Sequence, residues 1–255
     1  MRSQATFAIA IAALLATASF ATAKEWKTVR IGTEGAYAPF NFKDADGNLK
    51  GFEIDLGKAL CEKMKVECTF VAQDWDGIIP ALVAGKYDVI MASMSITDER
   101  KQAIDFSRPY YNTPSAFVAP KDTGLADNSA AGLSGKSLGA QSSTIQASYL
   151  EQNYKDADIK LYPSQEEVNL DLSSGRIDAL FVDKLVAIDW LKTDEGKCCA
   201  LLGKDIPVGG GVGAGVRKED TDLRDMISKA IEEVKADGTY AKINAQYFDF
   251  SIWTD

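Results

Sequence analysis

The alternation of short β-rich runs with helix-like segments constrains the fold of this chain most strongly. Runs rich in β-branched and aromatic residues recur along the sequence, separated by stretches with helical spacing of apolar residues. This alternation is typical of an α/β architecture. The β-rich runs lie at 29–33, 68–73, 87–93, 115–120, 136–141 and 178–183.

The clearest helix is predicted near the C-terminus, after the acidic residues Glu219 and Asp220. Apolar residues recur there at three- and four-residue spacing, and the pattern stops at Gly238. Thr97 is expected to cap a helix, and so is Ser164, with Glu167 three residues later. The apolar positions of the C-terminal helix are Leu223, Met226, Ile227, Ala230, Ile231 and Val234.

The N-terminus has the pattern of a secretory signal peptide. Arg2 precedes an apolar run over 5–20, and Ala21-Thr22-Ala23 gives a small-x-small cleavage pattern. The apolar run is short for a bilayer span, and no later segment approaches the required length. We therefore expect a signal peptide over 1–23 and an exported mature chain beginning at Lys24, with an uncleaved anchor as the alternative.

Charge and composition exclude several classes of function. The 255 residues carry a formal net charge of -9, which repels phosphate backbones, so we expect no nucleic-acid partner. The absence of histidine excludes Ser-His-Asp hydrolysis and most catalytic zinc chemistry, although carboxylate or lysine catalysis remains possible. Glycine-rich strings at 130–137 and 209–214 lack the strand-to-helix context of a nucleotide site, and "DADGN" at 44–48 is interpreted as a hairpin turn. We expect no metal and no cofactor.

Export to an oxidising compartment favours disulfides among the four cysteines. Cys61 and Cys68 lie seven residues apart, across the end of a predicted helix and the start of the next strand, and we expect them to form a disulfide. Adjacent cysteines bridge only through a strained eight-membered ring, so we expect Cys198 and Cys199 to be free buried thiols, or to have a partner that the sequence does not identify.

Several strings of the mature chain resemble the periplasmic amino-acid-binding components of ABC importers, in particular the lysine, arginine, ornithine and histidine subgroup. The resemblance implies two α/β lobes joined by two hinge strands, with the ligand enclosed between them. Lobe 1 is expected over 24–112 and 209–255, and lobe 2 over 113–208. The resemblance also implies a periplasmic, monomeric, non-enzymatic protein that serves a membrane permease. The strings are "IGTEGAYAPFNF", "GFEIDLGKALCEKM", "WDGIIPAL", "YDVIMASMSITDER", "SGRIDALFVD" and "VRKEDTDLRDMISKAIEEVKADGTYAKINAQYF".

The resemblance also implies roles for the residues that hold the amino-acid backbone. Arg100 is expected to bind the α-carboxylate through its planar fork, with a surface arginine as the alternative. Ser93 and Ser95 are expected to present hydroxyl and backbone groups, although they could form an ordinary turn. Thr144 could add anion contacts or serve as a plain helix cap, and Asp183 is expected to bind the α-ammonium.

The remaining implied roles concern the ligand's side chain. Tyr37 and Trp75 are expected to enclose it between aromatic faces, although Trp75 could instead be a core residue. Glu34 is expected to face the distal cation of a basic ligand. The subgroup more often has aspartate at this position, serine at Ala92 and threonine at Ile145, so these departures affect ligand identity.

Three other functions remain open. Some opine-binding proteins also resemble this chain, and they hold arginine conjugates that carry a second carboxylate. A few proteins of similar sequence are dehydratases for prephenate-like substrates. A sensor-coupled binding protein is the third alternative. The expected function is transport of arginine, lysine, ornithine or histidine.

Overall fold

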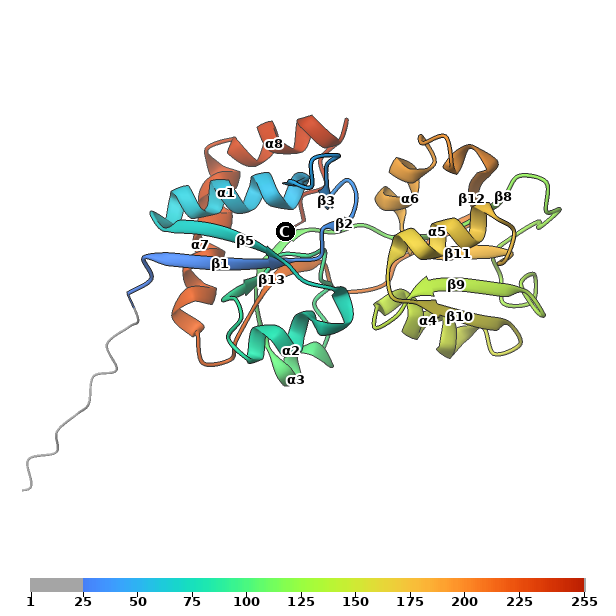
Figure 1. Cartoon of the computed structure of the whole chain (residues 1–255), viewed down its shortest axis with the longest axis horizontal. Coiled ribbons are helices and arrows are strands. Elements are labelled where there is room, and N and C mark those ends of the chain that lie inside the picture. The colour runs from blue at the N-terminus through green and yellow to red at the C-terminus, as the bar shows by residue number, and fades with distance from the viewer. Residues whose placement is uncertain (1–24, 255) are drawn as a thin grey trace, which may run out of the picture.

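The computed structural model describes residues 25–254, which form two α/β lobes side by side (Figure 1). The predicted signal peptide over 1–23 and the expected mature start at Lys24 lie outside the described residues. No helix within 25–254 combines the length and the apolar character that a membrane span requires.

The first lobe is built on a five-stranded sheet. Strands β5, β1, β6 and β7 run in the same direction, and the C-terminal strand β13 lies antiparallel between β6 and β7. The parallel strands therefore direct their carboxyl ends to one edge of the sheet. In sheet order the strands are β5 (Glu67–Ala72), β1 (Thr28–Thr33), β6 (Val89–Ile90), β13 (Val212–Val216) and β7 (Asp105–Tyr111).

Helices cover both faces of this sheet (Figure 1). The long C-terminal helix α7 (Thr221–Ala236) buries Leu223, Ile227, Ala230, Ile231 and Val234, which confirms the predicted helix and its apolar face. Met226 lies half-buried at the margin of that face. The other helices of this lobe are α1 (Phe52–Met64), α8 (Thr239–Tyr247), α2 (Ile78–Val83) and α3 (Arg100–Ala103), with a 3-10 turn η1 (Trp75–Gly77) before α2.

The second lobe repeats the same plan. Strands β10, β9 and β11 are parallel, β8 runs antiparallel to β11, and β12 runs antiparallel to β8. The strands are β10 (Asp158–Tyr162), β9 (Ser137–Gln141), β11 (Ala179–Asp183), β8 (Ser115–Pro120) and β12 (Cys199–Ile206). The helices are α4 (Ile145–Asn153), α5 (Gln165–Ser173) and α6 (Lys184–Trp190).

The chain passes between the two sheets twice. It leaves the first sheet after β7 and enters the second at β8, through residues 112–114, and it returns between β12 and β13 through residues 207–211. The return segment contains Gly209 and Gly211, both with φ of 86°, a backbone conformation that side chains other than glycine rarely adopt. The glycine-rich run therefore turns the chain into β13.

A small third sheet lies on the first lobe. It consists of β2 (Ala36–Tyr37), β3 (Asn41–Lys43) and β4 (Leu49–Lys50). Strands β3 and β4 are antiparallel, and Asp44 accepts hydrogen bonds from the backbone of Asp46 and Asn48 between them. The predicted hairpin turn at 44–48 is confirmed.

The two predictions about cysteines had different outcomes. Cys61 at the end of α1 and Cys68 in β5 form the expected disulfide, with Cα atoms 6.1 Å apart. The prediction that Cys198 and Cys199 are free thiols is wrong, because the two residues form a disulfide with each other. The 3-10 turn η2 (Gly196–Cys198) ends at this point and Cys199 is extended, so the two sulfur atoms come within bonding distance.

Candidate functional site

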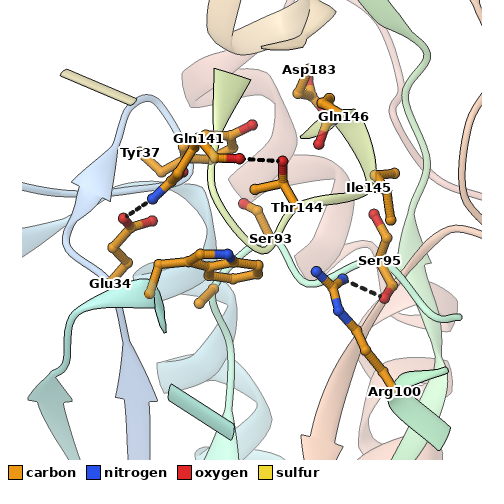
Figure 2. Close-up of a pocket in the computed structure, with 12 residues that line it drawn as sticks. Glu34, Tyr37, Ser93, Ser95, Arg100, Gln141, Thr144, Ile145, Gln146 and Asp183 are labelled. Atoms are coloured by element: carbon orange, nitrogen blue, oxygen red, sulfur yellow. Dashed lines mark hydrogen bonds between the residues drawn. The ribbon is translucent and has the colours of Figure 1, made fainter. Parts of the chain in front are cut away.

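The main candidate site is a pocket between the two lobes, at the carboxyl ends of strands from both sheets (Figure 2). Crevices at such strand ends are the usual ligand sites of open α/β sheets. The pocket contains about 370 Å³ of empty space, part of it open to solvent. All residues predicted to bind the ligand line it. The lining residues are Glu34, Tyr37, Trp75, Ala92, Ser93, Ser95, Arg100, Gln141, Thr144, Ile145, Gln146 and Asp183.

The first lobe contributes residues that follow its parallel strands. Glu34 comes directly after β1, and Trp75 starts the turn that follows β5. Ser93 lies three residues beyond the end of β6 and has a φ of 53°. Strand β6 (Val89–Ile90) is shorter than the predicted run 87–93. Arg100 is the first residue of α3.

The second lobe contributes the corresponding ends of β9 and β11. Gln141 is the last residue of β9, and Thr144 caps α4 immediately afterwards. Asp183 is the last residue of β11 and caps α6, where its side chain accepts a hydrogen bond from the Leu185 backbone N–H at 2.8 Å. Equivalent strand ends of both lobes thus face one another.

Arg100 holds its guanidinium against backbone carbonyls. Nη1 donates to the Ser95 carbonyl at 2.8 Å, and Nη2 donates to the Ser143 carbonyl of the other lobe at 3.1 Å. Its Cζ lies 5.2 Å from the centre of the Trp75 ring. Burial lowers the pKa of Arg100 to about 10, so the side chain remains charged at neutral pH. Within the described chain Arg100 has no salt-bridge partner.

Asp183 is a buried carboxylate that also lines the pocket. The Thr113 hydroxyl donates to its Oδ2. Burial raises the pKa of Asp183 to about 6, although the hydrogen bonds from Thr113 and the α6 backbone act in the opposite direction. A ligand cation would offset the cost of burying this charge.

Glu34 is the second buried carboxylate, at the far end of the pocket. Its Oε1 accepts a hydrogen bond of 2.6 Å from Nε2 of Gln141, across the boundary between the lobes (Figure 2). Burial raises the pKa of Glu34 to about 7, and the nearby charges of Glu166, Asp74 and Asp76 act in the same direction. The carboxyl group therefore titrates near neutral pH.

Ser93 is held by a carboxylate that the sequence analysis did not identify. The fully buried Glu53 of α1 accepts hydrogen bonds from the Ser93 backbone N–H at 2.8 Å and from its hydroxyl at 3.1 Å. Asn41 and Tyr110 also donate to this carboxylate. Because its proton is used in this way, the Ser93 hydroxyl can only accept a hydrogen bond from a ligand, which suits an ammonium group.

Thr144 likewise uses its hydroxyl within the protein. The hydroxyl donates to the Gln141 carbonyl at 2.7 Å and accepts from the Ala147 backbone N–H at 3.1 Å, as a helix cap does. The first backbone N–H groups of α4 have no partner within the helix and remain available for an anion. Of the two alternatives for the Thr144 hydroxyl, the structure shows the cap.

The two predicted aromatic residues both line the pocket. Trp75 is buried, and its Nε1 donates to the Ser143 carbonyl of the second lobe at 3.3 Å. Tyr37 is half-buried on the side opposite Arg100 (Figure 2). Burial raises the pKa of Tyr37 well above its ordinary value, so its hydroxyl stays protonated. Trp75 is therefore both buried and part of the pocket wall.

Further hydrogen bonds join the two lobes. Asp76 accepts from the hydroxyls of Ser142 at 2.9 Å and Ser143 at 2.7 Å. Together with the bonds from Arg100, Trp75 and Gln141, these contacts describe a closed arrangement of the two lobes.

Two lining residues were missed by the sequence analysis. Gln141 is the last residue of a predicted strand, the same type of position that identified Asp183, and could have been found on that basis. Gln146 is the second residue of α4 and donates to the Ser115 hydroxyl at 2.9 Å. Spacing alone gave no signal for this second residue. Among residues 25–254, no group of histidine, cysteine, aspartate or glutamate side chains could hold a metal ion.

Comparison with known proteins identifies a family over most of the chain. Residues 29–250 match the model of the bacterial extracellular solute-binding proteins, family 3. An L-arginine-binding protein of Pseudomonas aeruginosa is 44% identical over 234 residues, covering 89% of this chain and 90% of the relative. An octopine-binding periplasmic protein of Rhizobium meliloti is 43% identical over 244 residues, covering 85% of this chain and 82% of the relative.

A solved structure agrees with these relatives. An ancestral arginine-binding protein bound to arginine is 40% identical and superimposes with a TM-score of 0.82, covering 87% of this chain and 98% of that chain. The similarity thus extends through both lobes and the pocket between them.

Proposed function

The chain belongs to the bacterial extracellular solute-binding proteins of family 3, and from this premise we propose that it binds a basic amino acid and delivers it to the membrane permease of an ABC importer. The ligand is arginine, lysine, ornithine or histidine, and the protein acts as a monomer in the periplasm. Lobe 1 comprises 24–112 and 209–255, and lobe 2 comprises 113–208. The two connections between the sheets act as the hinge.

The distribution of charge in the pocket carries this proposal. Its lining includes one cation, Arg100, and two anions, Asp183 and Glu34, and Glu34 lies on the opposite side from the other two (Figure 2). A basic amino acid has the complementary pattern, with an α-carboxylate beside an α-ammonium and a second cation at the end of the side chain. Its net charge of +1 neutralises the pocket, whereas a neutral amino acid leaves Glu34 buried without a cation.

Each lining residue then has a distinct part in binding. Arg100 and the first N–H groups of α4 bind the α-carboxylate. Asp183 and the Ser93 hydroxyl accept hydrogen bonds from the α-ammonium. The stem of the side chain lies between Tyr37 and Trp75.

The two lobes hold separate halves of this site. Arg100, Glu34 and Ser93 belong to one lobe, and Asp183 and α4 belong to the other, so neither half binds well alone. The ligand therefore stabilises the closed arrangement by its differential contacts. The closed surface is what the permease recognises.

The protein binds its ligand without changing it. The relatives named above are binding proteins, and no step of the binding scheme requires a bond to form or break. A dehydratase on the same fold is the alternative, and it would consume the added ligand. Recovery of the amino acid unchanged after long incubation distinguishes the two.

A second candidate ligand is an opine, favoured by the similarity to the octopine-binding relative. An opine adds a carboxylate to a basic amino acid. Arg100 is the one cationic side chain among the residues that line the described pocket, and Glu34 and Asp183 oppose an additional negative charge. Basic amino acids are therefore the first choice.

A ligand panel tests the proposed function. The purified protein is heated with arginine, lysine, ornithine, histidine, glutamine or octopine, and small-angle scattering is recorded for the same samples. A basic amino acid at about 100 times its dissociation constant should stabilise the fold by roughly 2.7 kcal/mol. Its binding should also reduce the radius of gyration, because the ligand stabilises the closed arrangement. If none of the basic amino acids raises the melting temperature, the proposal is wrong, and a response to octopine alone selects the second candidate.

A further inference from the structure

The side chain of Gln141 makes two hydrogen bonds at the Glu34 end of the pocket. Its Nε2 donates to Oε1 of Glu34 at 2.6 Å and to the carbonyl of Pro163 at 3.1 Å. Only 3% of Gln141 is exposed, so these contacts form in a site from which bulk water is largely excluded. Both N–H groups of the amide are thereby used.

These two partners fix which way the amide faces. The Pro163 carbonyl can only accept a hydrogen bond, and so can an ionised Glu34. Rotating the amide by 180° would place its oxygen against both acceptors. The Gln141 Oε1 atom must therefore face away from them, and no hydrogen bond to it or to Oε2 of Glu34 occurs within the described chain.

From this geometry we infer that Gln141 is a specificity-determining residue, whose Oε1 forms with Oε2 of Glu34 a pair of acceptors for the distal cationic group of the ligand. This inference rests on the proposed function and deepens it. The pair offers two acceptors and no free donor. A guanidinium offers five donors in one plane, and an ammonium offers three, so both satisfy the pair.

The same pair rejects a neutral ligand of the same shape. Citrulline differs from arginine by an oxygen in place of one terminal nitrogen of the guanidinium, and it is uncharged. Citrulline still offers three N–H donors, but they are neutral, and its oxygen can only accept hydrogen bonds. Hydrogen bonds from a charged donor are stronger than those from a neutral one, so the acceptor pair binds citrulline less tightly than arginine, and Glu34 is left buried without a cation.

Gln141 and Glu34 come from different lobes, on β9 and after β1 respectively. The acceptor pair is therefore assembled only when the lobes close. It follows that the distal cation is selected during closure, whereas the single carboxylate of the open first lobe could attract any cation.

The test compares arginine with citrulline in Gln141→Met, which keeps the length of the side chain and removes both its donors and its acceptor. Loss of a hydrogen bond to a charged group should weaken arginine binding by roughly 10- to 100-fold. Citrulline binding should change by much less, so the ratio of the two dissociation constants, measured by calorimetry, should fall. Gln141→Asn, whose shorter amide reaches neither Glu34 nor Pro163, should lower the ratio in the same direction.

Ser142→Ala is the matched control. It removes a hydrogen bond across the lobes, to Asp76, without altering the wall of the pocket. It should weaken arginine and citrulline equally and leave their ratio unchanged. If both Gln141 variants weaken the two ligands by the same factor, Gln141 supports closure alone and the inference is overturned.

The failure of the proposed function would look different. In that case the unsubstituted protein would bind neither arginine nor any other basic amino acid, and Gln141 would have no distal cation to select. Tight binding of arginine by the unsubstituted protein, with an unaltered ratio in the variants, overturns the inference alone.

Discussion

The two ends of the pocket bury charge in different ways. At one end Arg100 is held by the backbone carbonyls of Ser95 and Ser143 and keeps a pKa of about 10, so it is charged at any physiological pH. At the other end Glu34 is held by one amide and has a pKa of about 7, so its charge depends on pH and on the ligand. In the proposed binding scheme, the Arg100 end therefore binds the amino-acid backbone at any physiological pH, whereas the Glu34 end selects the side chain in a pH-dependent way.

Arg100→Ala removes the cation of the pocket and should have the largest effect on affinity. The α-carboxylate loses its bidentate partner in a buried site, where removing one member of a charge pair is costly. We expect affinity for every amino acid, cationic or neutral, to fall by roughly 100-fold or more. Calorimetry with arginine and glutamine measures the loss.

Arg176→Ala is a suitable control for that variant, because Arg176 is exposed and pairs with Asp171 on the outer side of the second lobe. This variant should bind as the unsubstituted protein does. Undiminished arginine uptake by Arg100→Ala would mean that the carboxylate is bound elsewhere, and the proposed orientation of the ligand would be wrong.

Glu34→Gln separates the two ends of the pocket. The variant keeps the shape of the side chain and removes its charge, so a ligand with a distal cation should lose roughly 10- to 100-fold in affinity. Glutamine, which carries no distal cation, should bind as well as before or better, because a buried charge is no longer left unpaired. Dissociation constants for the two ligands give the result directly.

Glu166→Gln is the matched control for Glu34→Gln. Glu166 raises the pKa of Glu34 from a distance without lining the pocket, so its removal should change arginine affinity only slightly. An equal loss for arginine and glutamine in Glu34→Gln would contradict the role given to the Glu34 end.

The elements that the sequence predicted are those with strong local patterns. The helix over Thr221–Ala236 has a regular apolar stripe, and the strands ending at Gln141 and Asp183 are buried throughout or nearly so. Strands β7, β10, β12 and β13 lie outside the predicted β-rich runs. Strands β10 and β12 lie at the edges of the second sheet and have mostly exposed or half-buried residues, so their pairing depends on a neighbouring strand that a local pattern does not reveal.

Some residues of the site could likewise be predicted from local sequence patterns, and others could not. Residues at strand ends and helix starts, such as Arg100 and Asp183, could be proposed from the sequence with the help of a resemblance. Glu53 could not, because it lies 40 residues before Ser93 and its role is visible only once α1 packs on the first lobe's sheet. The pairing of Gln141 with Glu34 is hidden for the same reason, since it requires the lobes to be closed.

The smallest expected effect is the pH dependence of the preference for arginine over glutamine, which reports on the ionisation of Glu34. Burial raises the pKa of Glu34 to about 7, above its unfolded value, so the ligand-free closed form holds a proton that the unfolded chain has released. That form therefore loses stability as pH rises from about 4.5 to about 7. A distal cation stabilises the carboxylate, so binding of arginine below about pH 7 must expel the proton.

The affinity for arginine relative to glutamine should consequently rise about tenfold between roughly pH 6 and 8 and level off above this range. Using the ratio removes the contribution of Asp183, whose pKa of about 6 affects both ligands through the α-ammonium they share. Calorimetry in buffers of different ionisation enthalpy should show proton release with arginine that exceeds the release with glutamine. In Glu34→Gln the ratio should not vary with pH. If the ratio does not vary with pH in the unsubstituted protein, Glu34 is ionised over the whole range. Selection of the ligand's side chain would then be independent of pH, as binding by Arg100 is.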